Sequence, residues 1–233
     1  LPEGVARQES NYCYPVEIAH GAIEDLLQAG VDYMFLPHFR DMPSFEGEKV
    51  HAVTCPLTQG LPYYAKKAFP LDEARVLAPV VSFKAGWDAS RSEFEAVAVQ
   101  LGKSAQEGAF AYDAAVHHFR QFQEAYRARG RELLEEIRAN PDRLYVALLG
   151  RPYNAFTRDA NMGIPRKFTS RGVTVVPFDM IFDDSADIYP NMYWYYGQMD
   201  MKAVRRVRNI PNLMLTWVSN FSCAPDSFML HYL

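Results

Sequence analysis

Apolar residues occur along the chain in short continuous runs that alternate with stretches of helical spacing. The runs predict buried strands at residues 31–36, 76–83, 144–149, 173–177 and 213–218. Apolar positions three and four residues apart predict helices at residues 15–29, 90–101, 104–139, 161–171 and 191–207. Two weaker candidates are a strand at 51–54 and a helix at 58–67. This alternation of strands and helices predicts an α/β fold with parallel sheets.

Glycine and proline fix several of the expected boundaries. Pro15 suits the first turn of a helix, where its missing N–H costs nothing, and Gly30 is a suitable stop for the same helix. Pro79 interrupts an apolar run and favours an edge strand or a bulge there. The pair Asn140-Pro141 ends the long helix at 104–139.

The long helix predicts how the chain is divided. Its inner face is marked by Phe119, Phe122, Tyr126, Leu133, Leu134 and Ile137, with Arg and Glu on the outer face. A helix of this kind is typical of a connector. We therefore expect a first α/β lobe at 1–103, a helical connector at 104–141 and a second α/β lobe at 142–233.

Composition narrows the possible partners and compartments. The 49% hydrophobic content supports a core, and a net charge of -4 argues against nucleic acid as a partner. No apolar run reaches the roughly 20 residues that a bilayer requires, which argues against a membrane span. The chain starts at Leu1 without the pattern of a signal peptide, so we expect a fragment of a larger protein. An odd number of cysteines favours the reducing cytoplasm.

The three cysteines share one local pattern. Cys13, Cys55 and Cys223 each lie one or two residues before a proline where a helix can begin, and the last two follow strand candidates. Ligands of parallel sheets bind beyond the carboxyl ends of the strands, and a helix N-terminus favours the metal-binding thiolate. The pattern predicts that the three thiolates bind one iron–sulfur cluster of the 4Fe-4S type, leaving one iron without a cysteine.

Other interpretations of the cysteines stay open. A single free cysteine is usually a small buried hydrophobe, and the chain contains no C-x-x-C pair. Zinc is an alternative metal, with His20 or His38 as a fourth ligand, although both histidines also suit ordinary packing.

Polar residues near Cys223 are candidates for supporting a cofactor. Asn220, Asp226 and Ser227 belong to the segment NFSCAPDSF at 220–228, although helix capping also explains Asp226 and Ser227. The loop at 150–154 suits an anion but lacks a phosphate-binding motif. The aromatic run at 189–196 suits either ligand stacking or packing. No Ser/His/Asp arrangement, HExxH motif or paired-carboxylate motif stands out.

Four segments carry a resemblance to a known family. They are CYPVEIAHG at 13–21, LLGRPYN at 148–154, NMYWYYGQ at 191–198 and NFSCAPDSF at 220–228. They resemble an uncharacterised domain of CoA-substrate-specific enzyme activase-related proteins, over roughly Asn11 to Phe228. That domain is similar in turn to subunits of 2-hydroxyacyl-CoA dehydratases and benzoyl-CoA reductases, and to double-cubane-cluster reductases.

The resemblance implies a fold and a chemistry. It implies two flavodoxin/Rossmann-like lobes with parallel sheets and a cluster held between them by three cysteines, which correspond to Cys13, Cys55 and Cys223. It also implies an ATP-dependent activase that injects a low-potential electron, and an acyl-CoA substrate that receives it. The chain departs from the family pattern in three respects: it lacks an actin-like nucleotide-binding motif, it has cysteines for one cluster only, and Glu17 stands where a basic residue is expected.

Three functional hypotheses follow. The first is an iron–sulfur electron-transfer or reductase module that acts with an activase. The second is a non-catalytic docking domain of an activase-related protein, without a cluster. The third is a CoA- or nucleotide-binding module without metal, in which the loop at 150–154 would bind the ligand.

Overall fold

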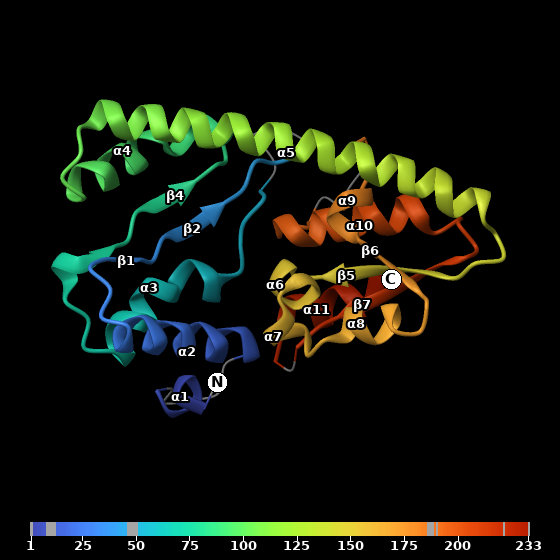
Figure 1. Cartoon of the computed structure of the whole chain (residues 1–233), viewed down its shortest axis with the longest axis horizontal. Helices are drawn as coiled ribbons and strands as arrows, with labels where there is room; N and C mark the ends of the chain where they lie inside the picture. The colour runs from blue at the N-terminus through green and yellow to red at the C-terminus, as the bar shows by residue number, and fades with distance from the viewer. Residues whose placement is uncertain are drawn as a thin grey trace. The chain divides into compact units, whose positions relative to one another are not determined.

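The computed structural model describes residues 2–7, 13–45, 51–185, 189, 191–220 and 222–232 (Figure 1). The chain forms two compact units, Leu1–Phe119 and Arg120–Leu233. The division falls within α5 (Ala105–Ala139), a helix of 35 residues. Parallel strands alternate with helices in each unit, which confirms the predicted α/β class.

The first unit contains short strands and longer helices. Its helices at 14–28, 56–68 and 91–100, and the start of the long helix at 105, agree with the predicted helical stretches to within about two residues, which is the usual uncertainty of helix ends. The short helix at 2–6 was not predicted. Its elements are α1 (Pro2–Ala6), α2 (Tyr14–Gln28), β1 (Met34–Phe35), β2 (His38–Asp41), α3 (Pro56–Ala68), η1 (Glu73–Arg75), β3 (Val76–Leu77), β4 (Val80–Ser82), η2 (Trp87–Ser90), α4 (Arg91–Gln100) and the first part of α5.

Two prolines interrupt the strands of the first unit. β1 pairs in parallel with β3, and β2 pairs in parallel with β4, with Pro37 and Pro79 between the two pairs. The backbone N–H of Leu36 donates to Leu77 O, and that of His38 donates to Pro79 O, both at 2.8 Å. Because proline has no N–H for the ladder, the apolar runs at 31–36 and 76–83 form short strands instead of two continuous ones.

The prediction of a strand at 51–54 is wrong. Val53 forms only an isolated antiparallel bridge with Asp41, and the Thr54 backbone N–H donates to Arg40 O at 3.0 Å. The segment therefore runs beside β2 without extending the parallel pairing.

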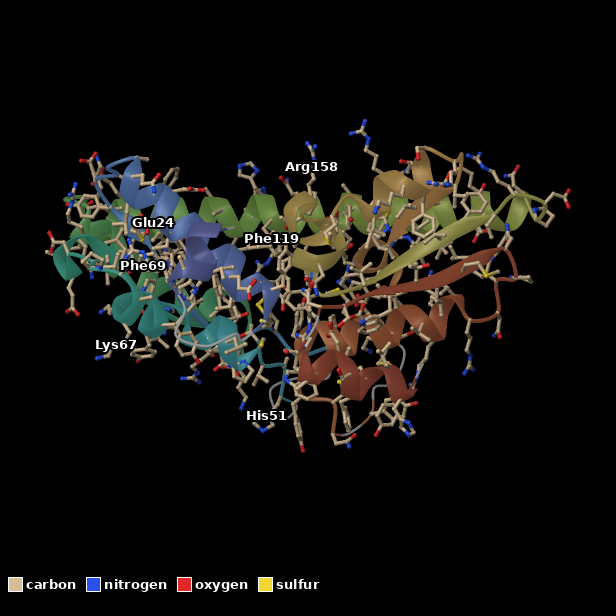
Figure 2. All side chains as sticks on the ribbon, turned by 90° about the horizontal axis from the view of Figure 1, so that it is seen from below. Glu24, His51, Lys67, Phe69, Phe119 and Arg158 are labelled. Atoms are coloured by element: carbon tan, nitrogen blue, oxygen red, sulfur yellow. The ribbon has the colours of Figure 1, made fainter. Side chains whose placement is uncertain are left out.

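Apolar clusters cover both faces of these strands. In Figure 1 the β2–β4 pair lies between α2 and α3 on one side and α4 with the first part of α5 on the other. One buried cluster joins α2 and α3 to β1 and to the residues that directly follow β1 and α3: Ile23, Met34, Leu36, Ala65 and Phe69. A second cluster joins the β4 region to α5: Val81, Phe83 and Tyr112. Figure 2 shows the contrast at the end of α3, where Phe69 is buried and Lys67 projects outward.

The second unit contains a three-stranded parallel sheet with the strand order β6-β5-β7. The three strands confirm the runs predicted at 144–149, 173–177 and 213–218. After α5 the elements are β5 (Tyr145–Gly150), α6 (Pro152–Phe156), α7 (Arg158–Asn161), α8 (Ile164–Thr169), β6 (Thr174–Pro177), α9 (Phe178–Ile181), α10 (Tyr195–Val207), β7 (Leu213–Val218), α11 (Ala224–Met229) and η3 (Leu230–Tyr232).

Two helices of the second unit differ from the expectation. The helix predicted at 161–171 is shorter in the structure, where it corresponds to α8 (Ile164–Thr169). It cannot begin at Asn161 because Met162 and Gly163, which separate α7 from α8, adopt left-handed conformations with φ of 52° and 71°. The helix predicted at 191–207 begins four residues later, at Tyr195.

Helix α5 buries only part of its predicted inner face. Leu134 and Ile137 are buried as expected, whereas Phe122 is 58% exposed, so its assignment to the inner face is wrong. Phe122 stacks instead on Tyr126, with ring centroids 5.3 Å apart. Among the described helices, α5 included, none is both long and apolar enough to cross a membrane.

The central strand sets the geometry of the second unit. All six residues of β5 are buried, as expected for a strand with neighbours on both sides and helices over the sheet. The chain passes from β5 to β6 on one side, and then crosses to β7 on the other side (Figure 1). In open parallel sheets, the point where the chain changes direction in this way is where ligands bind, beyond the carboxyl ends of the strands.

Candidate functional site

The carboxyl ends of β5 and β7 bring two polar loops together. Gly150 at the end of β5 pairs with Val218 at the end of β7. Arg151 and Asn154 follow β5, while the segment from Ser219 to Asp226 follows β7. We call this group of loops the switch-point site.

Gly150 allows the two strand ends to approach closely. Its φ is 128°, a conformation that residues with a side chain rarely adopt. A Cβ atom at this position would lie 2.3 Å from the carbonyl oxygen of Val218. The site therefore requires glycine both for its backbone conformation and for its spacing.

A buried ion pair lies at the centre of the switch-point site. The Nε of Arg151 donates to Oδ1 of Asp226 at 3.0 Å, and the two side chains are 2% and 0% exposed. The Ser219 hydroxyl donates to Oδ2 of the same carboxylate at 2.9 Å. Asp226 thus joins the β5 and β7 loops, and no side-chain cap bond is present at the start of α11. Capping does not explain this aspartate.

Two asparagines form a second link between the loops. The Nδ2 of Asn220 donates to the Oδ1 of Asn154, which is buried. Among the described residues, the buried atoms Nη2 of Arg151 and Nδ2 of Asn154 have no hydrogen-bond partner. Both atoms are donors, and leaving a donor buried and unpaired costs about 1–3 kcal/mol, so the site suits an acceptor atom bound between the loops.

Asp200 of α10 holds the end of β5 at Gly150. Its Oδ1 accepts a hydrogen bond from the Gly150 backbone N–H at 3.1 Å, and the side chain is fully buried. Burial raises the pKa of Asp200 well above its usual value; the Gly150 hydrogen bond and Arg151 oppose the rise, while Asp226 adds to it. The environment of Asp200 therefore favours its protonated, neutral form beside the Arg151–Asp226 pair.

Replacing Asp200 with asparagine is expected to change how stability depends on pH. The pKa of an aspartate in the unfolded chain is about 3.9. At pH values between about 3.9 and the raised pKa of folded Asp200, this carboxyl keeps its proton in the folded state but has lost it in the unfolded chain. The free energy of unfolding should therefore fall by about 1.4 kcal/mol per pH unit in this window from this group alone. The Asp200→Asn variant keeps an acceptor for Gly150 and should lose that slope. Urea unfolding of both proteins from pH 4 to 8 measures the difference, and parallel curves would contradict the assignment.

Cys223 precedes α11 within the same loop. It is the N-cap residue, it is half-buried, and it follows Ser222, whose φ is 65°. Burial raises the pKa of the Cys223 thiol to about 12; the Asp226 backbone N–H and the Arg151 charge oppose the rise, while the Asp226 charge adds to it. The thiol is neutral at pH 7, so a metal that binds here must displace its proton.

Ser227 is exposed, one residue beyond Asp226. Its hydroxyl donates to the carbonyl oxygen of Cys223 at 2.9 Å, which is a local bond inside the helix. A role for Ser227 in cofactor binding stays a prediction.

Cys13 and Cys55 occupy equivalent local positions in the first unit. Each is the N-cap residue of its helix, α2 and α3 respectively, with a proline at the first or second helical position. Both are half-buried. All three cysteines therefore begin a helix, as the sequence predicts.

The metal site itself stays a prediction. Among the residues that the structure describes, no three His, Cys, Asp or Glu side chains form a group suited to a metal ion. His20 and His38 are buried, and the Nδ1 of each lies within hydrogen-bonding distance of a backbone carbonyl, at 2.8 and 3.0 Å. Their contacts are those of packing histidines.

Sequence reasoning missed much of the switch-point site. It passed over Ser219 and Asp200, and it named Arg151 and Asn154 only as parts of a loop that suits an anion. A charged residue directly after the apolar run at 144–149 was one available signal. An aspartate between Met199 and Met201 was another.

Comparison with known proteins identifies a matching family model. The family model described as CoA enzyme activase uncharacterised domain (DUF2229) matches residues 1–181. The match includes Cys13, Cys55 and the loop after β5, but not β7 or Cys223. No curated protein matches the chain, and no solved structure matches it.

Proposed function

Because the chain belongs to the CoA enzyme activase uncharacterised domain family, we propose that it is an iron–sulfur electron-transfer or reductase module. The proposed cofactor is a 4Fe-4S cluster with Cys13, Cys55 and Cys223 as ligands. Cys13 and Cys55 belong to the first unit and Cys223 to the second, so the proposal requires both units to contribute to one cluster.

One observation carries the proposal. Every cysteine of the chain is the N-cap residue of a helix that has proline at its first or second position. All three side chains are half-buried. Structural cysteines are usually buried hydrophobes, so the half-buried position that the three cysteines share before a proline supports a chemical role.

The donor chemistry suits a cluster. Cysteine thiolates are the usual ligands of iron–sulfur clusters, which accept and pass on single electrons. At the switch-point site, Arg151 and Asp226 would hold the loop of Cys223, and the Asn154–Asn220 bond would fix the loop beside it. Three cysteines leave one iron open to a non-protein ligand.

The family description supports an activase-related context for the proposal. We expect an ATP-dependent activase to deliver electrons to the module, in the reducing cytoplasm and within a larger protein or assembly. An acyl-CoA is the proposed final acceptor.

Anaerobic reconstitution with iron and sulfide tests the proposal. We expect about four irons per chain and an EPR signal from the reduced protein. The single variants Cys13→Ala, Cys55→Ala and Cys223→Ala should each lose the signal and most of the iron, because a cluster with two cysteine ligands is poorly held.

Ser170→Ala is the matched control, because it removes an exposed hydroxyl that donates to a backbone carbonyl, in a segment of the second unit that contains no cysteine or proposed cofactor residue. Its iron content should equal that of the unchanged chain. Iron that persists in all three cysteine variants, or a folded chain that binds none, would overturn the proposal. In the latter case, an activase complex that survives loss of all three cysteines would identify the chain as a docking domain.

A further inference from the structure

A separate pocket in the second unit is lined by three arginines. It has a volume of about 250 Å³ and lies between α5, the end of α9 and the loop after α9. Arg127 and Arg131 line it from α5, and Arg206 lines it from α10. The proposed cluster function does not use these residues.

Close packing of two helices builds the pocket. Gly130 lies on α5 between Arg127 and Arg131, and a Cβ atom there would be 1.9 Å from the carbonyl oxygen of Met180 in α9. Glycine therefore lets α5 touch the backbone of α9. The Tyr126 hydroxyl donates to Oδ1 of Asp179 at 3.1 Å and joins the same two helices.

The apolar floor is buried. Leu134 and Ile181 are 1% and 2% exposed, and Phe182 is 8% exposed. The guanidinium carbon of Arg127 lies 4.4 Å from the centre of the Phe182 ring, which fixes the plane of this arginine. The pocket thus has an apolar base and a charged rim.

The charges of the rim do not balance. Arg127 pairs with Asp184, and Arg206 pairs with Asp183 at 3.4 Å. The Ser185 hydroxyl donates to Asp183 at 2.7 Å and lowers the pKa of Asp183, so this carboxylate stays ionised. Among the described residues, no carboxylate pairs with Arg131. Three permanent positive charges therefore face two negative ones.

We propose that this pocket binds the phosphate group of a small molecule. Guanidinium groups donate paired hydrogen bonds that match phosphate oxygens, and they stay charged at every physiological pH. The volume suits a phosphate with a small organic group rather than a large ligand. Arg131 provides the unpaired charge, and Arg127 and Arg206 provide further donors beside it.

Calorimetric titration of the full chain with orthophosphate and with ribose 5-phosphate tests the site. Arg131→Gln should weaken binding about tenfold, because it removes charge-assisted hydrogen bonds. Asp183→Asn should strengthen binding about two- to fivefold, because it removes a repelling charge and keeps an acceptor for Ser185. Tighter binding of ribose 5-phosphate would identify a phosphate ester as the ligand, and tighter binding of orthophosphate would identify the free ion.

Arg158→Gln is the matched control, since it removes the same charge from the second unit outside the pocket. Figure 2 shows Arg158 pointing away from the ribbon, and its side chain is exposed. This variant should bind as the unchanged chain does. Equal affinities of the Arg131→Gln and unchanged proteins, or no binding at about 10 mM of either ligand, would overturn the proposal. Cysteine variants should not alter the titration, so this test is independent of the cluster.

Discussion

Arg151→Met is expected to destabilise the second unit by about 3–5 kcal/mol. The change keeps most of the side-chain volume but removes the charge that compensates Asp226, whose side chain is 0% exposed. The Ser219 hydroxyl would still donate to the buried carboxylate, but the negative charge would have lost its positive partner. Urea unfolding, together with hydrogen exchange of the β5 and β7 amides, measures the loss where it should be concentrated.

A double variant separates two contributions to the free energy of unfolding: the cost of leaving Asp226 without a partner, and the stabilisation that the Arg151–Asp226 pair itself provides. Arg151→Met combined with Asp226→Asn removes both charges and should recover much of the lost free energy. Arg138→Met is the matched control, because Arg138 pairs with Glu135 at 2.6 Å with both side chains well exposed. It should change the free energy of unfolding by less than about 0.5 kcal/mol. If Arg151→Met were equally mild, the ion pair would not be the centre of the site.

Gly150→Ala is the second change with a large expected effect. The left-handed backbone costs about 1–3 kcal/mol for a residue with a side chain. The overlap with Val218 O, 2.3 Å from the new Cβ, adds about 1–3 kcal/mol of overpacking. Because β5 and β7 must separate, the same urea and hydrogen-exchange measurements should show a loss of protection at the ends of both strands.

Gly172→Ala distinguishes backbone strain from overlap. Gly172 also has a positive φ, of 77°, but nothing lies within 4 Å of an added Cβ. This control should cost only about 1–2 kcal/mol. Equal losses in the two variants would show that the approach of β5 to β7 does not depend on Gly150.

The two proposed sites depend on different residues. The cluster proposal depends on the thiols of Cys13, Cys55 and Cys223, whereas the phosphate proposal depends on Arg131 and the charges around it. Either can fail while the other holds. If both hold, the second unit contributes to a redox centre and also recognises a phosphorylated small molecule.

The sequence by itself determined the local structure of this chain. Apolar periodicity predicted α2, α4, α5, β5, β6 and β7, because the helical and strand repeats differ and helix ends carry their own signals. The proline beside each cysteine predicted that Cys13, Cys55 and Cys223 begin helices, since proline favours the first helical turn. Local errors arose where backbone geometry overrode periodicity, as at Met162 and Gly163.

Only the tertiary structure decided which polar residues meet. Arg151 and Asp226 are separated by 75 positions, and no local rule connects a residue after β5 with one after β7. The strand order β6-β5-β7 brings the two ends together, and the low polarity of the interior then requires each buried charge to find a partner. The arginine pocket has the same origin. Arg127, Arg131 and Arg206 are ordinary surface residues in the sequence, and they become one site because Gly130 lets α5 pack against α9.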